Sequence, residues 1–282
     1  MRKLIVNADD FGRHVLINDA VIQGHVEGCI TSATLMPSAA AFDDAVTKAA
    51  AHPSLGVGVH LTLIGEKPLL PPEQIPSLVD ENGQLAEKYP QFMARFFKGA
   101  VSLKEVRAEL AAQIQKVVDS GLRITHIDSH QHLHVLPGII DIALELAAAH
   151  QIKAVRIPSV PLGFTGGYSC TPGQFVGRSG LIFLAALARR KARQRGFRTP
   201  DHFFGIVAGG GLREESFLEI LRKLPAGSTE IMIHPGTDNQ ALAAACGWAH
   251  QFEEELQTAL SSQAKSLLKE RSITLASFRD IP

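Results

Sequence analysis

Acidic and histidine side chains stand at the ends of several apolar segments of this 282-residue sequence. Asp9 and Asp10 follow LIVNA, and His60 lies near the end of LGVGVHLTL. Asp128 and His130 end the segment RITHIDSH. One carboxylate with two imidazoles, leaving positions open for water, is a common ligand set for catalytic divalent metals. Asp10, His60 and His130 are the candidates for this set.

The adjacent residues Asp9 and Asp10 raise an electrostatic question. Two close carboxylates repel each other unless a proton or a cation lies between them. A divalent ion bound by Asp10 is one answer, because its charge allows both carboxylates to stay ionised. Asp9 is then available to take a proton from a metal-bound water. The plainer alternative is that the pair only caps a helix and interacts with its dipole.

Two further polar residues end predicted strands. His234 ends TEIMIH, and we expect it to be the general acid that protonates a leaving amine. Arg156 ends KAVR, and with Asp128 it is a candidate for orienting an aspartate or holding a substrate group. The plainer alternatives are that His60 is a hydrogen-bonded core histidine and that Arg156 forms a structural ion pair.

The remaining histidines are expected to have supporting or surface roles. The imidazoles of His130, His132 and His134 share one face only if the chain stays extended. We therefore expect His132 and His134 to support the metal ligands from behind, and His126 to pack beneath the site. Five others lie in predicted helices or loops and are expected at the surface: His14, His25, His52, His150 and His250.

The candidate residues recur at one point of a repeating strand–helix pattern. Predicted strands cover residues 3–7, 30–36, 55–63, 123–128, 153–157, 203–207, 229–234 and 272–276. Predicted helices cover about residues 15–28, 41–52, 103–120, 138–150, 214–223 and 249–270. Such alternation is typical of βαβ units with a parallel sheet.

We therefore predict an α/β fold, a (β/α) barrel-like single domain over residues 1–282 with seven or eight strands, similar to a TIM barrel. A doubly wound open sheet is the alternative. In a barrel the C-terminal ends of the strands meet at one face, which is where catalytic residues collect.

Two lid insertions are predicted, at about residues 64–102 and 158–200. The first contains five prolines, and the second has Gly- and Pro-rich turns followed by a basic helix. Long loops in a compact domain are usually functional. Residues 178–198 combine an apolar half with many Arg and Lys residues. We favour a lid helix with a solvated basic end over a peripheral membrane contact with anionic lipid.

The composition excludes several classes of protein. Hydrophobic residues make up 45%, and 28 basic residues balance 28 acidic ones, so no overall charge favours a nucleic-acid partner. We expect no membrane span, because no apolar run reaches 18 residues, and no signal peptide. The three cysteines form no CxxC motif, which suggests reduced thiols. These features predict a cytoplasmic protein, and a homodimer is compatible with them.

Five motifs, in this order, resemble the YdjC-like carbohydrate deacetylases, a family that includes chitooligosaccharide deacetylases and hopanoid-associated glycolipid deacetylases. They are NADDFG at 7–12, VGVHLTL at 57–63, HIDSHQHLH at 126–134, VRIP at 155–158 and EIMIHPG at 230–236. The resemblance covers nearly the whole chain. It implies a (β/α) barrel-like fold, a divalent metal (magnesium or zinc), and hydrolysis of an N-acetyl group from an amino sugar with release of acetate.

The same resemblance implies roles for individual residues. The metal ligands are Asp10, His60 and His130, and the general base is Asp9. His234 is assigned as the acid by analogy with related polysaccharide deacetylases. The substrate is an N-acetylated oligosaccharide or glycolipid, which the two insertions should select. The rival functions are another metal-dependent hydrolase, such as an amidohydrolase or phosphoesterase, and a non-catalytic metal- or sugar-binding protein.

Overall fold

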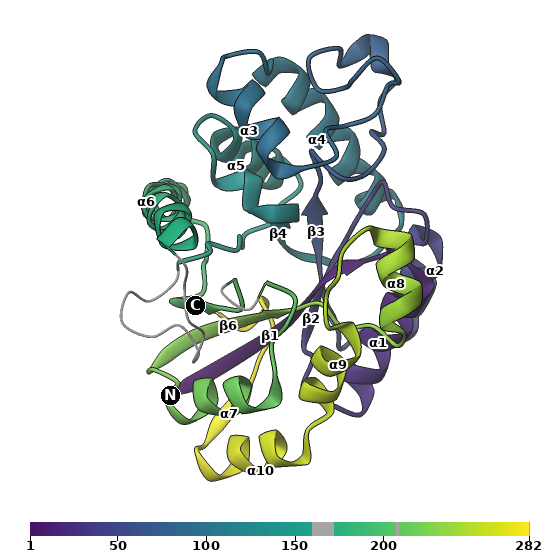
Figure 1. Ribbon diagram of the computed structural model, residues 1–282. Helices are drawn as coiled ribbons and strands as arrows, with labels where there is room; N and C mark the ends of the chain where they lie inside the picture. Colours follow the sequence, from purple (N-terminus) through teal and green to yellow (C-terminus); the bar gives the residue numbers. More distant parts are fainter. Residues whose placement is uncertain (160–171, 207–208, 282) are drawn as a thin grey trace.

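The protein is built on one sheet of parallel strands (Figure 1). The computed structural model describes residues 1–159, 172–206 and 209–281, with the backbone alone for residues 172–179. The strands are β1 (Arg2–Phe11), β2 (Ser32–Leu35), β3 (Gly56–Leu61), β4 (Ile124–Ser129), β5 (His202–Phe204), β6 (Gly227–Ile233) and β7 (Ile273–Leu275). Their order is β4-β3-β2-β1-β6-β5, and β7 pairs with the first residues of β1.

The predicted α/β, barrel-like fold is confirmed in part: the parallel sheet is a curved half-barrel with open edges at β4 and β5, and it does not close into a TIM barrel. The strand expected at 153–157 is reduced to two isolated bridges, Ile127–Val155 and Ala154–Arg198. A ladder needs consecutive hydrogen-bonded pairs, and Pro158 has no N–H with which to continue this one. The other seven predicted strands are confirmed, with shifted ends.

Ten α-helices and two short 3₁₀-helices surround the sheet in the described part of the chain. The α-helices are α1 (Val15–Val26), α2 (Phe42–Ala51), α3 (Tyr89–Phe97), α4 (Leu103–Asp119), α5 (Ile139–Ala149), α6 (Pro172–Gln194), α7 (Glu214–Arg222), α8 (Asn239–Cys246), α9 (Phe252–Leu260) and α10 (Ser262–Glu270). The 3₁₀-helices are η1 (Pro72–Gln74) and η2 (His130–Val135). In Figure 1, α3, α4 and α5 lie together above β3 and β4, and α7, α9 and α10 lie below β1 and β6.

Local sequence explains one difference from the predicted helices. The single helix expected at 249–270 is two helices, α9 and α10, which meet at Ser261. The Ser261 side chain accepts a hydrogen bond from the backbone N–H of Ala264 at 3.0 Å. A serine in this position caps the first turn of a new helix, so the chain starts α10 instead of extending α9.

The centre of the sheet is apolar on both faces. Leu4, Ile5, Val6 and Ala8 of β1 are all completely buried. Such a continuous run, instead of an alternating one, is expected when helices cover both faces of a parallel sheet. The buried core fixes β1, and β1 in turn carries Asp9 and Asp10 at its C-terminal end.

The insertion at 64–102 folds as a loop with η1 and α3 and is tied to α4. Glu109 of α4 is buried, and its carboxylate accepts hydrogen bonds from the backbone N–H groups of Leu69 and Leu70 at 2.9 and 3.0 Å. A buried carboxylate is tolerated when backbone donors satisfy it. These contacts hold the start of the insertion against the body of the protein.

The insertion at 158–200 contains α6, and its residues 160–171 lie outside the described part of the chain. Lys191 of α6 and Arg195, which directly follows this helix, form ion pairs with Asp141 of α5 at 2.5 and 2.9 Å. Phe183 is 65% exposed, and Leu187 is also exposed. Contact of 178–198 with anionic lipid stays a prediction from the sequence. None of the helices in the described ranges is long and apolar enough to cross a membrane.

Candidate active site

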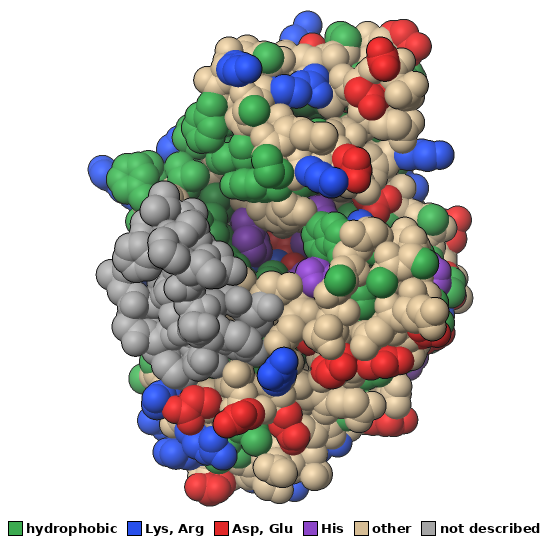
Figure 2. Space-filling model, viewed as in Figure 1, with side chains coloured by type: hydrophobic (Ala, Val, Ile, Leu, Met, Phe, Trp, Pro, Cys, Tyr) green, Lys and Arg blue, Asp and Glu red, His purple; other side chains and the backbone are tan. Residues whose placement is uncertain are grey.

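A cavity of about 300 Å³ opens at the C-terminal ends of the strands. Figure 2 shows this hollow, with histidine and acidic side chains at its base. Its lining includes four of the predicted site residues: Asp9, His60, His130 and His234. Tyr89 of α3 and Leu181 of α6 line it as well. Both insertions therefore border the cavity.

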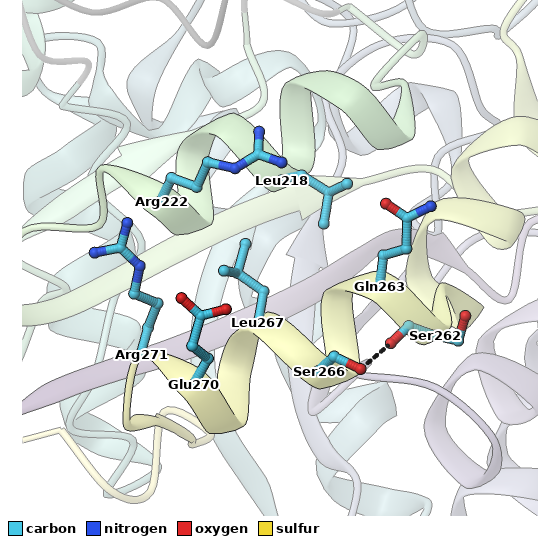
Figure 3. Close-up of a pocket in the computed structure, with 8 residues that line it drawn as sticks. All are labelled: Leu218, Arg222, Ser262, Gln263, Ser266, Leu267, Glu270 and Arg271. Carbon is cyan, nitrogen blue, oxygen red and sulfur yellow. Dashed lines mark hydrogen bonds between the residues drawn. The ribbon is translucent and has the colours of Figure 1, made fainter.

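A second hollow, between α7 and α10, has a different character (Figure 3). Among its lining side chains, Ser266 donates a hydrogen bond to the backbone oxygen of Ser262 at 3.0 Å. Arg222 precedes β6 and Arg271 precedes β7, so this hollow lies toward the N-terminal ends of the strands. In folds of this kind, ligands bind at the opposite ends.

Asp10 departs from regular strand geometry. Its φ angle is 60°, and the pairing of β1 with β2 shifts register between Ala8 and Phe11. In a regular strand, neighbouring side chains point to opposite faces. The irregularity lets both Asp9 and Asp10 reach the site while facing different partners. Aspartate is among the residues that adopt this left-handed conformation most readily.

The Asp10 carboxylate contacts three cationic or potentially cationic side chains. Its Oδ1 lies 3.0 Å from His130 Nδ1 and 3.3 Å from His60 Nε2, and its Oδ2 lies 3.0 Å from Arg13. Burial opposes ionisation of this carboxyl, but His130 and Arg13 hold its pKa well below the usual range. Asp10 is therefore an ionised carboxylate. The predicted ligands Asp10, His60 and His130 lie together, all buried.

The orientation of His60 is compatible with a proton or a metal ion between its ring and Asp10. Its Nδ1 donates a hydrogen bond to Asp128 Oδ1 at 2.7 Å. In the neutral ring, Nε2 then carries a lone pair directed at the Asp10 carboxylate, which is unfavourable unless a proton or metal ion lies between them. Without a metal, Asp128 and Asp10 raise the pKa of His60 to about 10 against the effect of burial.

The spacing of the donor atoms also fits a small divalent ion. Donor atoms held at about 2.0–2.2 Å from one ion, at angles of roughly 90–110°, are separated by about 3–3.6 Å. The distances of 3.0 and 3.3 Å from Asp10 Oδ1 to His130 and His60 fall in this range. The set of one carboxylate and two imidazoles suits zinc or iron, and the carboxylate also suits magnesium.

A second group, Asp9, His60 and Asp128, is also close enough to share an ion. In this group, however, both Asp9 oxygens and Asp128 Oδ2 lie 2.6–2.7 Å from the Arg156 guanidinium. Asp128 Oδ1 is bound by His60. A guanidinium already fills the position that an ion would take. The geometry therefore favours Asp10, His60 and His130 as the ligand set.

Arg156 is the centre of a buried ionic cluster. It is 0% exposed and forms two hydrogen bonds of 2.7 Å with Asp9. It also donates to Glu230 Oε1 at 2.7 Å and lies 2.6 Å from Asp128 Oδ2. Planar, two-pronged pairing of this kind fixes a carboxylate in place. Arg156 therefore orients Asp9, and its burial keeps it from touching a substrate. It also answers the electrostatic question, because Asp9 has its own counter-ion.

Glu230 is the third carboxylate of this cluster, and no pattern in the sequence marked it as a site residue. Burial, together with the nearby Asp9 charge, raises the pKa of Glu230 to about 8 although Arg156 acts in the opposite direction. One guanidinium cannot balance three carboxylates in an apolar interior. Near neutral pH, Glu230 therefore keeps its proton more readily than Asp128, whose pKa is lowered.

Glu230 should make the protein less stable as pH rises. Between its unfolded pKa near 4.5 and its folded pKa of about 8, the folded state holds a proton that the unfolded state has released, so stability falls with rising pH. Glu230→Gln is expected to remove this loss, so that between pH 5 and pH 8 wild type should lose at least about 1.4 kcal/mol more of its free energy of unfolding than the variant, the equivalent of one pKa unit. Urea unfolding at pH 5 and pH 8 measures it. If the stabilities of wild type and Glu230→Gln changed with pH in parallel, this prediction would be refuted. Glu215→Gln, at an exposed glutamate, is the control.

His234 is held by a buried carboxylate from α9. Its Nδ1 lies 3.7 Å from Glu255 Oε2, and its backbone N–H also donates to this oxygen. Burial disfavours the charged ring, but Glu255 raises the pKa of His234 above its ordinary value. Because Nδ1 faces Glu255, the opposite ring edge, with Nε2, is left for the cavity that His234 lines. A protonated ring in this position can donate a proton into the cavity.

The three histidines near η2 do not share one face. Gln131 and His132 have φ angles of 51° and 58°, which break the extended geometry. His134 bonds to Ser129 Oγ at 2.7 Å and to the Arg156 carbonyl at 2.8 Å, so it supports the site from behind, as predicted. His132 instead lines the cavity itself. His126 stacks on Phe278 with ring centroids 3.6 Å apart and is buried.

The loop between α8 and α9 contributes rings that sequence reasoning missed. Trp248 stacks on His130 at 4.9 Å, and His250 stacks on His234 at 5.0 Å. Arg13 lies over the Trp248 ring. The prediction that His250 lies at the surface is wrong, because it lines the cavity. The alternation of aromatic residues at 248, 250 and 252 was the available signal.

Comparison with known proteins finds one family model and several similar proteins that match nearly the whole chain. A family model described as YdjC-like protein matches residues 3–270. A carbohydrate deacetylase of Brevibacillus brevis is 32% identical over 99% of each chain. A chitooligosaccharide deacetylase of Yersinia pestis is 30% identical over 98% of each chain.

Solved structures share the fold. A putative cellobiose-phosphate cleavage protein from Enterococcus faecalis superimposes with a TM-score of 0.78 at 30% identity, covering 99% of this chain and 98% of that one. A lactam utilization protein from Thermus thermophilus has a TM-score of 0.52 at 16% identity, covering 98% of this chain and 99% of that one, and shows similarity of fold alone.

Proposed function

Because this chain belongs to the YdjC-like protein family, we propose that it is a metal-dependent carbohydrate deacetylase. It hydrolyses the N-acetyl group of an amino sugar in an oligosaccharide or glycolipid and releases acetate. One observation carries the proposal: a buried ligand set of one carboxylate and two imidazoles adjoins a cavity that both Asp9 and His234 line. This arrangement supports the proposal that a base and an acid act on the same amide bond.

Asp10, His60 and His130 would hold the divalent ion, which supplies Lewis-acid polarisation of the acetyl carbonyl and a more acidic water. Asp9 removes the proton from the attacking water. Arg156 holds Asp9 by both oxygens, yet each carboxylate oxygen can accept more than one hydrogen bond. Arg156 is the single donor that Oδ2 has in the described structure, so this oxygen can also accept from a water in the cavity.

His234 supplies the second proton transfer. The leaving group of amide hydrolysis is an amine, which must be protonated to depart. His234 carries the required proton because Glu255 raises its pKa. Glu255 is buried and is also anchored by the backbone N–H of Leu212 at 2.6 Å. The carboxylate therefore keeps both the position and the charge of the imidazole.

Glu255→Gln is expected to shift the pH profile of acetate release. A general acid must be protonated, so activity is lost as pH rises through its pKa. Removing the Glu255 charge lowers the pKa of His234, and the alkaline limb of kcat/KM should therefore move to lower pH. Steady-state rates from pH 5 to 10 measure this shift. An unmoved limb would show that Glu255 does not set the proton affinity of His234, and exposed Glu253→Gln is the matched control.

The test of the proposed function is acetate release by the metal-loaded protein. The panel contains N-acetylglucosamine, chitooligosaccharides and N-acetylated glycolipids, and a phosphomonoester and a cyclic amide are included for the rival hydrolase functions. Acetate release from one of the sugars supports the proposal. Turnover of only the phosphomonoester or cyclic amide would replace it with another hydrolase. Sugar binding without any turnover, equal in wild type and Asp9→Asn, would indicate a binding protein.

A further inference from the structure

His250 occupies a position in the cavity that the mechanism above does not use. It comes from the loop between α8 and α9, and its ring stacks on His234 with centroids 5.0 Å apart and planes at 21°. Trp248 and Phe252 meet the same ring edge-on at 4.8 and 5.4 Å. Three aromatic neighbours fix the plane of the imidazole, so the directions of its two nitrogens are fixed as well.

One of these nitrogens faces the backbone. A methyl group built on Gly210 would lie 1.6 Å from His250 Nδ1, so this edge of the ring packs directly on the glycine segment. His250 also has a hydrogen bond with the Gly209 backbone that raises its pKa. A bond that favours the protonated ring goes to a carbonyl oxygen, because an acceptor prefers an N–H donor. His250 Nδ1 is therefore the donor nitrogen.

The other nitrogen has no partner. Nε2 of His250 is buried and makes no hydrogen bond with any residue that the structure describes. Because Nδ1 carries the proton in the neutral ring, Nε2 is a pure acceptor. A buried acceptor left without a donor costs free energy. Ile206 and Met232 line the same cavity, and their apolar side chains have no hydrogen-bond donor to offer.

The adjacent His234 keeps His250 neutral. Two stacked imidazoles do not both hold a proton easily, because like charges repel. Glu255 gives the proton to His234, while burial and the His234 charge lower the pKa of His250 to about 4. The pair therefore has divided roles: His234 is the donor of a proton, and His250 is a fixed, uncharged acceptor.

We propose that His250 binds the substrate sugar, with Nε2 accepting a hydrogen bond from one of its hydroxyl groups. This inference rests on the proposed deacetylase function and extends it to a residue that selects the substrate. A sugar presents several O–H donors around its N-acetyl group, and an acceptor fixed in the cavity wall selects the hydroxyl group that reaches it. The hydroxyl relieves the unpaired nitrogen and positions the amine side of the scissile bond near His234.

The test compares two substitutions at one position. His250→Phe keeps a ring on His234 and removes Nε2, whereas His250→Gln can return an acceptor atom to about the same place. We expect His250→Phe to lower kcat/KM by about three- to ten-fold, mainly through KM, the effect of one neutral hydrogen bond, and His250→Gln to recover part of it. Gln251→Ala, with an exposed side chain in the same loop, should match wild type.

A panel of monodeoxy N-acetylglucosaminides identifies the hydroxyl. For the sugar that lacks the bound hydroxyl, wild type and His250→Phe should react equally, whereas every other sugar should show the full loss. An equal loss on all the sugars, or no loss on any, would overturn the proposal. A shift of the alkaline limb with unchanged KM would overturn it too, because His250 would then act through His234.

A binding measurement separates this inference from the proposed function. Calorimetric titration of the accepted N-acetylglucosaminide into Asp9→Asn and into Asp9→Asn/His250→Phe compares affinities without turnover. Weaker binding by the double variant supports the inference, and equal affinities overturn it. If wild type releases no acetate from any sugar, the deacetylase function fails, and the same titration still decides whether His250 binds sugar.

Discussion

Asp9→Asn is expected to lower kcat/KM for acetate release by about 10²–10⁴-fold, the usual contribution of a general base, while the protein still binds its metal. Asparagine keeps the shape of the side chain but cannot accept a proton at neutral pH. The expected signature is a loss in kcat with metal content unchanged. Acetate release and elemental analysis of the same preparation measure both quantities.

The buried cluster around Arg156 explains why this variant should fold. After the substitution, Arg156 still has Asp128 at 2.6 Å and Glu230 at 2.7 Å as partners, so no cation is left alone in the interior. The amide oxygen can still accept from Arg156, and the loss of one of three carboxylates reduces their mutual repulsion. A variant that loses metal, or that keeps more than a tenth of the wild-type activity, would show that Asp9 is not the base.

Asp10→Asn makes the same change at the next residue, but we expect it to weaken metal binding, which Asp9→Asn should leave unchanged. It removes a charged ligand, and the expected loss of metal affinity is larger than the roughly 10–100-fold that changes outside the ligand set cause. Activity should fall to background at micromolar metal and return in part at millimolar metal. Asparagine tolerates the left-handed backbone at this position, so a folding defect is not expected.

Metal titration followed by acetate release distinguishes the two variants. Asp10→Asn should be rescued by added metal and Asp9→Asn should not. If added metal rescues Asp9→Asn instead, the ligand set is Asp9, His60 and Asp128, and Arg156 must move on metal binding. If neither variant changes metal affinity, Asp10 is not a ligand, and its role is limited to pairing with Arg13 and the two histidines.

The site was more predictable from sequence than the sheet around it. Strand ends in a parallel sheet meet at one edge, so Asp9, His60, His130 and His234 could be placed together from their positions alone. Closure of the barrel depended on residues 153–157, whose apolar pattern is strand-like but whose ladder stops at isolated bridges. Periodicity reports which residues prefer an extended chain, and it does not report whether a neighbour is present to pair with them.

The partners of the site residues required the tertiary structure. Glu230 and Glu255 look like ordinary polar residues of a strand and a helix, and their importance follows only from burial against Arg156 and His234. His250 lies in a short loop, and local sequence cannot tell whether such a loop turns toward solvent or toward a cavity. These contacts join positions that are far apart in the chain, so they cannot be predicted from the local spacing of residues.

The sequence by itself determined which side chains are candidates for metal-assisted hydrolysis and at which edge of the sheet they gather. The tertiary structure decided which partners each of the two adjacent aspartates contacts. A register shift and a left-handed residue in β1 turn Asp10 toward His60 and His130, while Arg156 binds Asp9. The reason is physical: a charge is stabilised by the partners within a few ångströms of it, and those distances are set by the packed fold.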